Sequence, residues 1–453
     1  MELNRRDFLK GAVATGALAA TGSALAACSP SGGAASGAAS AGSAAGASDV
    51  LTADSYQQMK WSFEIPPEPV ADADIAETIT HDIVVVGAGM AGLCTAVSAA
   101  EQGADVIVFS ASSKPISRGG SNHAIGSKYQ KAKGIDYSPE TAREIVKAEQ
   151  TAGTYLMDKK KWERWINHSG ESIDWTIHHM EKQGLKCCLE PGYYDPDGTI
   201  TVPPASHNFY TDEQPFGALY GAPLEAQAYA DIFTGDFGGE IHYKTVAQYL
   251  IREDDNTGRV SGVVAQREDG SYVKYVANNA GLLATGDCSK NPDMMAKYSP
   301  WAWEHFKDAL SFGDVDYDAE LVYSGLMPGD GQKMGIGSGA DMDEFACGDL
   351  WPFAAVMMNG TLPTTFDGTH FYAGVANLPV LMVDGAGRRL MAENLPFQSP
   401  SIPKLTCTPD GCAWSIWDSA WKEKFPEGGY MVEDYTASNT QEEVDNNVGH
   451  GIT

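Results

Sequence analysis

Three glycines lie where a buried-strand pattern gives way to a helical one. Gly87, Gly89 and Gly92 follow the apolar run 82–86. In such a Gly-x-Gly-x-x-Gly turn, the first glycine permits the tight turn, the second lets the backbone approach a pyrophosphate, and the third lets helix and strand pack closely. The helix N-terminus presents free N–H groups to the phosphates. With residues 105–109 as a second strand, the sequence predicts a dinucleotide-binding βαβ unit; the alternative is a glycine-rich structural turn.

Further segments rich in small residues extend this interpretation. Residues 258–265 and 272–276 predict a hairpin, and residues 282–287 predict a buried strand that ends in the turn Ala-Thr-Gly-Asp. A β-meander followed by Ala-Thr-Gly is typical of the second half of a flavoprotein with two dinucleotide-binding folds. The glycines and small side chains of residues 116–126 would let the chain lie along a flavin ring. Residues 328–335 predict a turn into another helix.

Charge and cysteine spacing argue against several functions. The net charge of −29 and the pI near 4.6 argue against nucleic-acid partners and against adhesion to an anionic membrane surface. None of the eight cysteines belongs to a C-x-x-C-H or C-x-x-C pattern, so we expect no attached haem and no metal site. We expect free, mostly buried thiols, with Cys94 buried on the first helix and Cys187 and Cys188 in the core.

The first 50 residues indicate export. Arg5 and Arg6 form a twin-arginine signature, and a run of small and apolar residues leads to Cys28, which we interpret as the lipidated first residue of the mature protein. The alternative is a transmembrane helix, for which the run is slightly short. Residues 1–28 are thus a lipoprotein signal, and residues 29–50 a flexible Ser/Gly/Ala linker. A single acyl chain anchors weakly, so we expect more than one.

The order of these motifs resembles the FAD-dependent fumarate reductase/succinate dehydrogenase flavoprotein family. The chain looks most like exported, lipoprotein-type twin-arginine reductases of gut actinobacteria. The resemblance implies an α/β fold, with a Rossmann-like two-dinucleotide-binding-fold flavin domain over residues 51–358. It also implies an inserted α+β capping domain, here partial, over residues 359–453.

The resemblance also implies which residues hold FAD. Ala247 matches the position whose backbone meets the adenine, and Ser110 stands where the family has an acidic residue that bonds the ribose. A serine can still bond a hydroxyl, though less strongly than a carboxylate. The full expected set is Gly87, Ala88, Gly89, Met90, Ala91, Gly92, Ser110, Gly119, Gly120, Ser121, Asn122, Ala247, Ala284, Thr285, Gly286, Asp287 and Asp330.

The expected capping domain departs from the family pattern. Its proton-donating arginine would fall near Phe397, but residues 390–453 contain no arginine, and the carboxylate clamp expected upstream reads Tyr-Ala-Gly-Val-Ala from Tyr372. Fumarate is therefore not the expected substrate. Tyr372 or His370 could donate the proton, with Arg389 as a remaining cation; alternatively the first two are ordinary loop residues, and Arg388 and Arg389 pair with Glu393.

The sequence stops within the expected capping domain, at Thr453. We expect a fragment of an interrupted gene; the alternative is completion by a second polypeptide. Tryptophans 301, 303, 351, 414 and 417 could line an aromatic substrate pocket, although core packing is the commoner role of such residues.

The expected activity is reduction of an activated C=C bond in a small molecule, an enoate or unsaturated lactone, by hydride transfer from flavin N5. Electrons would come from a separate membrane-associated cytochrome at the extracytoplasmic face, where the lipid anchor is the only contact expected with the membrane. The alternatives are a flavin-dependent ketosteroid-type dehydrogenase and an inactive truncated remnant.

Overall fold

The chain divides into two units, Met1–Pro66 and Pro67–Thr453. We describe them from a computed structural model. The structure describes residues 61–117, 121–152, 158–189, 193–194, 201–202, 204–213, 221–300, 303–304, 307, 314–319, 327–342, 381–390 and 414–416. The expected signal and linker, and most of the expected capping domain, lie outside these residues.

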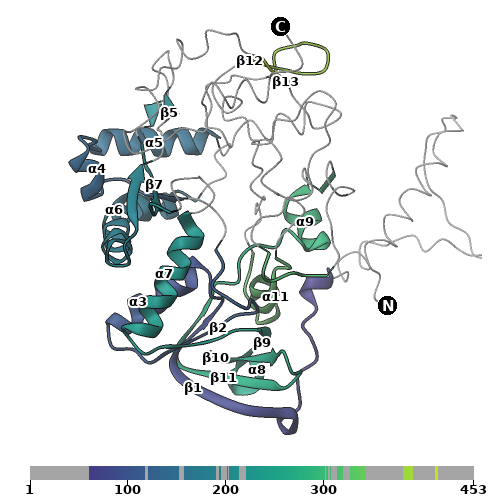
Figure 1. Ribbon diagram of the computed structural model, residues 1–453. Helices are drawn as coiled ribbons and strands as arrows, with labels where there is room; N and C mark the ends of the chain where they lie inside the picture. The colour runs from purple at the N-terminus through teal and green to yellow at the C-terminus, as the bar shows by residue number, and fades with distance from the viewer. Residues whose placement is uncertain are drawn as a thin grey trace, which may run out of the picture. The chain divides into compact units, whose positions relative to one another are not determined.

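The described part of the first unit contains the 3-10 helix η1, Ser62–Glu64. The second unit contains the other elements (Figure 1). Its strands are β1 Ile75–Val86, β2 Val106–Phe109, β3 Ser121–His123, β4 Lys186–Leu189, β5 Tyr193–Tyr194, β6 Thr201–Val202, β7 Ser206–Tyr210, β8 Glu240–His242, β9 Thr245–Arg252, β10 Val260–Arg267, β11 Tyr272–Leu283, β12 Leu381–Val383 and β13 Trp414–Ile416. Its helices are η2 Asp72–Asp74, α3 Met90–Glu101, α4 Lys128–Ala132, α5 Pro139–Ala152, α6 Lys159–Lys182, α7 Gly221–Gly235, α8 Glu253–Asn256, α9 Pro292–Tyr298 and α11 Asp330–Gly337.

A six-stranded sheet in the order β8-β2-β1-β11-β10-β9 organises the second unit. The first four strands are parallel, and β9, β10 and β11 form an antiparallel meander. The long strand β11 belongs to both parts: its first half pairs with β10 and β1, and its second half continues beside β1. This continuity joins the parallel sheet to the meander.

Strand β2 and the last three residues of β1 are buried on both faces, which explains their unbroken apolar runs. Alternate residues point to opposite faces. Val85 and Val108 pack with helices α3, α6 and α7 in one core cluster, and α3 and α7 lie side by side in Figure 1. The residues that pack instead with the meander are Val84, Val86, Ile107 and Phe109.

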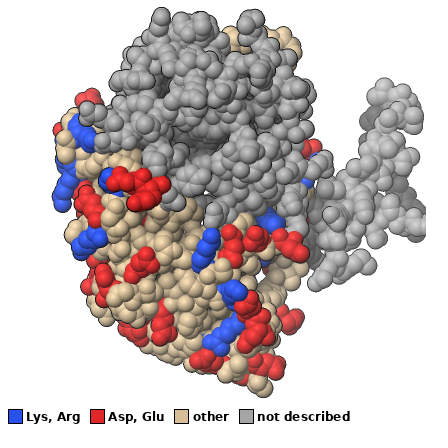
Figure 2. All heavy atoms as spheres, viewed as in Figure 1, with Lys and Arg blue, Asp and Glu red and all other residues tan. Residues whose placement is uncertain are grey.

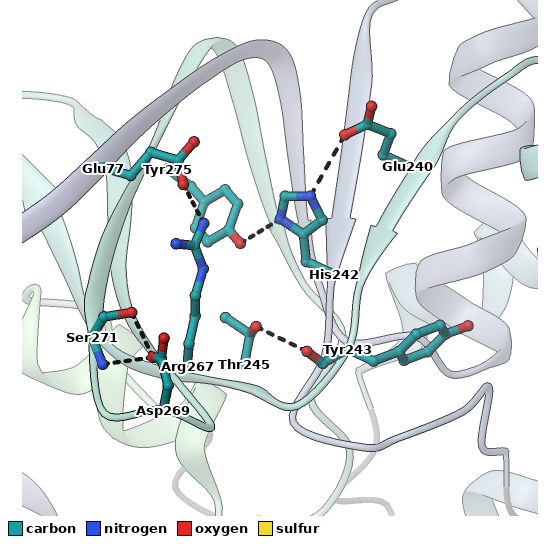
Figure 3. A network of polar contacts seen from close by, with 9 residues as sticks. All are labelled: Glu77, Glu240, His242, Tyr243, Thr245, Arg267, Asp269, Ser271 and Tyr275. Carbon is teal, nitrogen blue, oxygen red and sulfur yellow. Dashed lines mark hydrogen bonds and ion pairs between the residues drawn. The ribbon is translucent and has the colours of Figure 1, made fainter.

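A polar network surrounds the contact between the meander and the parallel strands (Figure 3). The rings of Phe109 and Tyr275 stack with centroids 4.3 Å apart. Tyr275 Oη lies 2.8 Å from His242 Nδ1, and Glu240 lies 3.5 Å from Nε2 of the same ring. Because a carboxylate only accepts, Nε2 carries the proton and Nδ1 accepts from the tyrosine. Burial raises the pKa of Tyr275 to about 12, so the phenol remains a donor.

A small sheet, β3-β7-β4, holds the segment after the expected flavin-facing glycines. Asn122 of β3 is paired with His207 of β7. Ser127 begins α4 with a capping box that it shares with Gln130, and its hydroxyl lies 2.8 Å from His207 Nε2. Together these bonds fix the backbone of β3 against β7 and α4.

Charged side chains are distributed rather than grouped on the surface. In the described part of the face shown in Figure 2, Lys and Arg are interspersed with Asp and Glu. Some form exposed pairs, such as Lys244 with Glu268 at 2.8 Å. Exposed pairs contribute about 0–1 kcal/mol each, so the stability of the fold depends mainly on its cores. Among the described residues, no helix combines the length and the apolar character needed to cross a membrane.

The structure agrees with the expected βαβ unit and meander, and it corrects three details. Strand β1 begins at Ile75 rather than at residue 82. Residues 272–283 form one strand, and Leu283 is 38% exposed rather than buried, because β10 stops pairing with β11 at Val276. Cys94 lies on α3 as expected but is half-buried.

We predict that Tyr275→Phe destabilises the protein by about 1 kcal/mol, because His242 Nδ1 loses its donor. Phe109→Ala should cost more, about 3–5 kcal/mol, because it removes a fully buried ring. Urea unfolding followed by tryptophan fluorescence measures both changes. Tyr272→Phe on the same strand is the matched control. Equal losses for the two tyrosine variants would contradict the role of the histidine bond.

Candidate flavin site

The turn from β1 to α3 is shaped by contacts within the chain. Gly87 has a φ of +111°, and a Cβ there would lie 2.3 Å from the carbonyl oxygen of Ala284. A Cβ on Gly92 would lie 2.0 Å from the carbonyl oxygen of Gly87. Both distances are far below van der Waals contact, so strand, helix and β11 approach this closely only because these residues are glycines.

Gly89 differs from both neighbours in what surrounds it. Among the described atoms, a Cβ on Gly89 would have a single neighbour within 4 Å, the carbonyl oxygen of Ile116 at 3.0 Å. Gly89 is the N-cap of α3; no side chain caps the helix, and its first turn has no acidic residue. Among the described residues, no capping side chain therefore competes for the first-turn N–H groups of α3. This arrangement fits a pyrophosphate.

The end of β11 forms a second wall of the turn. Ala284 donates its N–H to Val86 O at 2.8 Å, which places the Ala-Thr-Gly-Asp turn directly beside the glycine turn. Gly331 N–H donates to Thr285 Oγ1 at 3.0 Å, and a Cβ on Gly331 would lie 2.3 Å from that oxygen. These contacts join the expected cofactor residues 284–287 to the start of α11.

Asp330 begins α11 at this junction. Its carboxylate accepts from Tyr317 Oη at 2.9 Å and pairs with Lys333 Nζ at 2.6 Å. Met327 N–H donates to Asp287 Oδ1 at 3.4 Å. The structure therefore brings together residues 284–287 and Asp330, which the sequence separates by more than 40 positions.

The expected adenosine residues also come together. Ser110 follows β2, donates its N–H to His242 O at 2.9 Å and accepts from Thr245 N–H at 2.8 Å. Ala247 lies two residues beyond Thr245 on β9. The Ser110 hydroxyl lies 2.8 Å from that of Ser112, which donates onward to Lys114 O. A hydroxyl chain thus stands where the family has a carboxylate.

The segment expected to face the flavin ring shows a contact that the sequence did not predict. Ser121 and Asn122 lie on β3, whereas Gly119 and Gly120 lie outside the described residues. Asn122 Nδ2 lies 2.9 and 2.8 Å from the two carboxyl oxygens of Glu225, on α7. Glu225 is fully buried, and burial raises its pKa to about 8. The one available signal was a lone glutamate at an apolar helical position.

Of the expected catalytic residues, Arg389 is among the residues that the structure describes. Tyr372, His370 and Glu393 lie outside the described residues. Arg389 is exposed and bridges Val383 through its backbone, beside a tight turn in which Asp384 accepts from the Arg388 side chain at 2.7 Å. The role of Arg389 in catalysis therefore stays a prediction.

Other expectations concern thiols, metals and tryptophans. Cys187 and Cys188 are buried, and the described residues include no His/Cys/Asp/Glu group that could hold a metal ion. Of the tryptophans proposed for a pocket, Trp303 is half-buried and Trp414 is 42% exposed on β13. Trp301, Trp351, Trp417 and the expected lipidation site Cys28 lie outside the described residues.

Comparison with known families decides the cofactor. Residues 82–407 match the FAD binding domain family, and residues 2–22 match the twin-arginine translocation pathway signal sequence. The chain belongs to the FAD binding domain family. Its cofactor is FAD. The uncapped start of α3 is where its phosphates are expected, and this placement stays a prediction.

Characterised relatives of this family member are reductases by name. The chain is 26% identical to vinyl phenol reductase of Lactiplantibacillus plantarum over 70% of this chain and 58% of that one. It is 25% identical to digoxin reductase of Eggerthella lenta over 96% of this chain and 71% of that one. A cytochrome-type fumarate reductase of Shewanella frigidimarina is 26% identical over 69% and 48%. The chain thus spans from about half to seven-tenths of the length of these relatives.

Solved structures show the same fold at low identity. A 3-ketosteroid-Δ4-(5α)-dehydrogenase from Rhodococcus jostii superposes with a TM-score of 0.55 and 22% identity, over 84% of this chain and 76% of that one. The open conformation of a flavocytochrome c3 fumarate reductase gives a TM-score of 0.50 and 20% identity, over 88% and 62%. At these identities the likeness establishes the α/β fold alone.

We predict that one glycine substitution at the turn weakens FAD binding and that another impairs folding. Gly89→Val should still fold, after Ile116 shifts by a few tenths of an ångström, because Ile116 O would lie 3.0 Å from the new Cβ. It should lower FAD affinity at least about 100-fold, because its side chain enters the expected phosphate space. Gly92→Ala should instead impair folding, because its Cβ overlaps Gly87 O. Flavin content by absorbance and unfolding by circular dichroism separate the two effects. Stoichiometric flavin in folded Gly89→Val would place the cofactor elsewhere.

Proposed function

We propose that this chain is an FAD-dependent oxidoreductase that reduces an activated carbon–carbon double bond in an enoate or an unsaturated lactone-like substrate. The observation that carries the proposal is the space beside Gly89, bordered by free helix N–H groups in a chain of the FAD binding domain family. The names of two relatives, vinyl phenol reductase and digoxin reductase, support reduction of a larger, less charged molecule than fumarate.

The residues around the β1–α3 turn and the end of β11, here called the flavin cradle, would each bind one part of FAD. When bound, FAD supplies the hydride for such a reduction. The first-turn N–H groups of α3 would hold its phosphates, Ser110 would bond the ribose, and the Ala247 backbone would meet the adenine. Tyr372 or His370 would hold the proton for the second carbon, and Arg389 would supply positive charge near the substrate.

The sequence around the expected substrate region supports exclusion of fumarate. Residues 390–453 contain no arginine, and residues 372–376 lack the glutamate and arginine of the family's carboxylate clamp. Two carboxylates in a closed site without cationic partners would cost several kcal/mol of uncompensated charge. The proposed substrate therefore carries less charge around the double bond than the two carboxylates of fumarate.

The proposed location follows from the twin-arginine signal over residues 2–22. We place the protein at the extracytoplasmic face of the membrane, anchored through lipid on Cys28 and exported folded, with FAD already bound. The flavin domain would cover residues 51–358 and the substrate-capping region residues 359–453. Because these 453 residues contain no C-x-x-C-H motif, a separate cytochrome would supply the electrons.

The substrate proposal predicts that the chain uses electrons from reduced viologen to reduce enoate esters or unsaturated lactones. Turnover with fumarate should be at least about 100-fold slower, which corresponds to about 2.7 kcal/mol of transition-state binding. Anaerobic absorbance assays across a substrate panel measure this ratio, with the Gly89→Val protein as the flavin-free control. Fumarate turnover that equals the best enoate would overturn the substrate assignment, and a colourless protein would overturn the enzyme assignment.

The location proposal predicts that Cys28→Ala releases the protein from membranes, because the acyl anchor is lost. Replacing Arg5 and Arg6 together by lysine should retain the protein inside the cell. Fractionation and immunoblotting measure both outcomes. Cys94→Ala is the matched control and should partition like the natural chain. Membrane association that survives Cys28→Ala would count against lipid anchoring.

A further inference from the structure

Glu225 is a fully buried acid at the edge of the flavin cradle. Its two oxygens lie 2.8 and 2.9 Å from the Asn122 amide nitrogen, and its side chain has no exposed surface. A buried carboxylate normally requires a cation or several hydrogen-bond donors, because removal of a charge from water is costly. Here the partner is one neutral amide, which compensates a full charge poorly.

Most of the elements around Glu225 contain no lysine or arginine: helices α3 and α7 and strands β3 and β7 have neither. Helix α6, which also packs against α7, carries lysines and an arginine, and all of them are exposed. Burial lowers the pKa of His207, to about 4, and that of His179, so both rings are neutral at pH 7.

The other titratable side chains lie on the same elements. They are Cys94 and Glu101 on α3, His123 on β3, Tyr210 on β7, Glu240 and His242 on β8, and Tyr229 and Asp231 on α7 itself. On α6 they are the half-buried Asp174 and the exposed Lys159, Lys160, Lys161, Glu163, Arg164, His168, Glu171, His178, Glu181 and Lys182.

The position of Glu225 couples it to the flavin cradle through two routes. Burial raises the pKa of the Cys94 thiol, in the second turn of α3, and the charge of Glu225 adds to this rise, so the acid lies near the N-terminal half of α3. Ile116 donates its N–H to Ala88 O beside the glycine turn, and Asn122 follows six positions later, on β3. Asn122 thus connects Glu225 to the strand that follows this part of the site.

We propose that Glu225 is a positioning residue that works as a neutral acid, holding Asn122 of β3 in place for FAD. A neutral carboxyl can bond the amide on both sides after a small rotation, since its O–H donates to Oδ1 and its carbonyl accepts from Nδ2. Ionisation removes the first of these bonds. It also adds a buried negative charge beside a site for a doubly charged pyrophosphate.

The expected pH dependence follows from the direction of the shift. The raised pKa, about 8, means that folded Glu225 is neutral over a range in which the unfolded chain is ionised. Folding therefore binds a proton, and this contribution to stability falls as pH rises from the ordinary carboxyl range to about 8, after which it is constant. FAD should in turn bind more weakly above about pH 8, because it favours the neutral form.

The test is a titration of FAD into the flavin-free full chain at about pH 6 and about pH 10, on either side of the Glu225 pKa of about 8. For the natural chain, the Kd should rise about tenfold, equivalent to one pKa unit of coupling between FAD and the acid. Glu225→Gln mimics the neutral acid and should show a rise of less than about twofold. Asp231→Asn, an exposed acid on the same helix, is the matched control and should behave like the natural chain.

A purely structural role predicts a different result. In that case Glu225→Gln would change the urea midpoint and leave the pH dependence of the Kd as in the natural chain, which would overturn the proposal. Asn122→Ala should weaken FAD binding at both pH values, and unchanged binding would also overturn it. The inference depends on FAD occupying the cradle and not on the substrate. Failure of the natural chain to bind FAD would overturn both this inference and the proposed function, whereas a pH-independent Kd would overturn this inference alone.

Discussion

The close approach of three backbone segments at the β1–α3 turn is the constraint on which the rest of the site depends. Gly87 meets the carbonyl oxygen of Ala284, and Gly92 meets that of Gly87, at distances that no Cβ could occupy. The contact fixes where β11 ends, and therefore where Thr285 meets the start of α11 through Gly331. This close approach is possible only because both positions lack a Cβ. Gly89 contributes differently, because its missing side chain leaves space for a ligand.

The six-stranded sheet packs against a core on each face and holds the β1–α3 turn in place. Alternate residues of β1 and β2 supply both cores, so a change in strand register would move each set to the wrong face. The meander core includes the Phe109–Tyr275 stack, and Ser110 follows Phe109 directly. The packing of the meander therefore determines where Ser110, the expected ribose contact, lies. Ser110 O accepts from Thr245 N–H, two residues before Ala247 on β9, although the sequence places Ser110 and Ala247 far apart.

The sequence predicted the parts of this site that depend on local chemistry. The spacing of the glycines, the apolar strands and the small-residue turn after β11 each carry a short-range signal, and the structure has all three. It did not predict the start of β1 at Ile75, because those residues are partly exposed and pair with a strand almost 200 positions away. The Asn122–Glu225 contact was missed for the same reason, since its partners are 103 positions apart. Long-range polar pairs leave no period in the sequence.

The negative charge of the chain limits how the cradle can attract FAD. The chain carries a net charge of −29, yet it must bind a cofactor with a negatively charged pyrophosphate. Of the described residues at the cradle, Lys333 is a cation, and it is already paired with Asp330. Among the described residues, the backbone N–H groups at the start of α3 are therefore the expected source of attraction, and such dipoles hold about half an elementary charge. A partial charge of that size is easily offset by one buried carboxylate nearby. The protonation of Glu225 consequently bears on binding more than it would in a cradle lined by arginine.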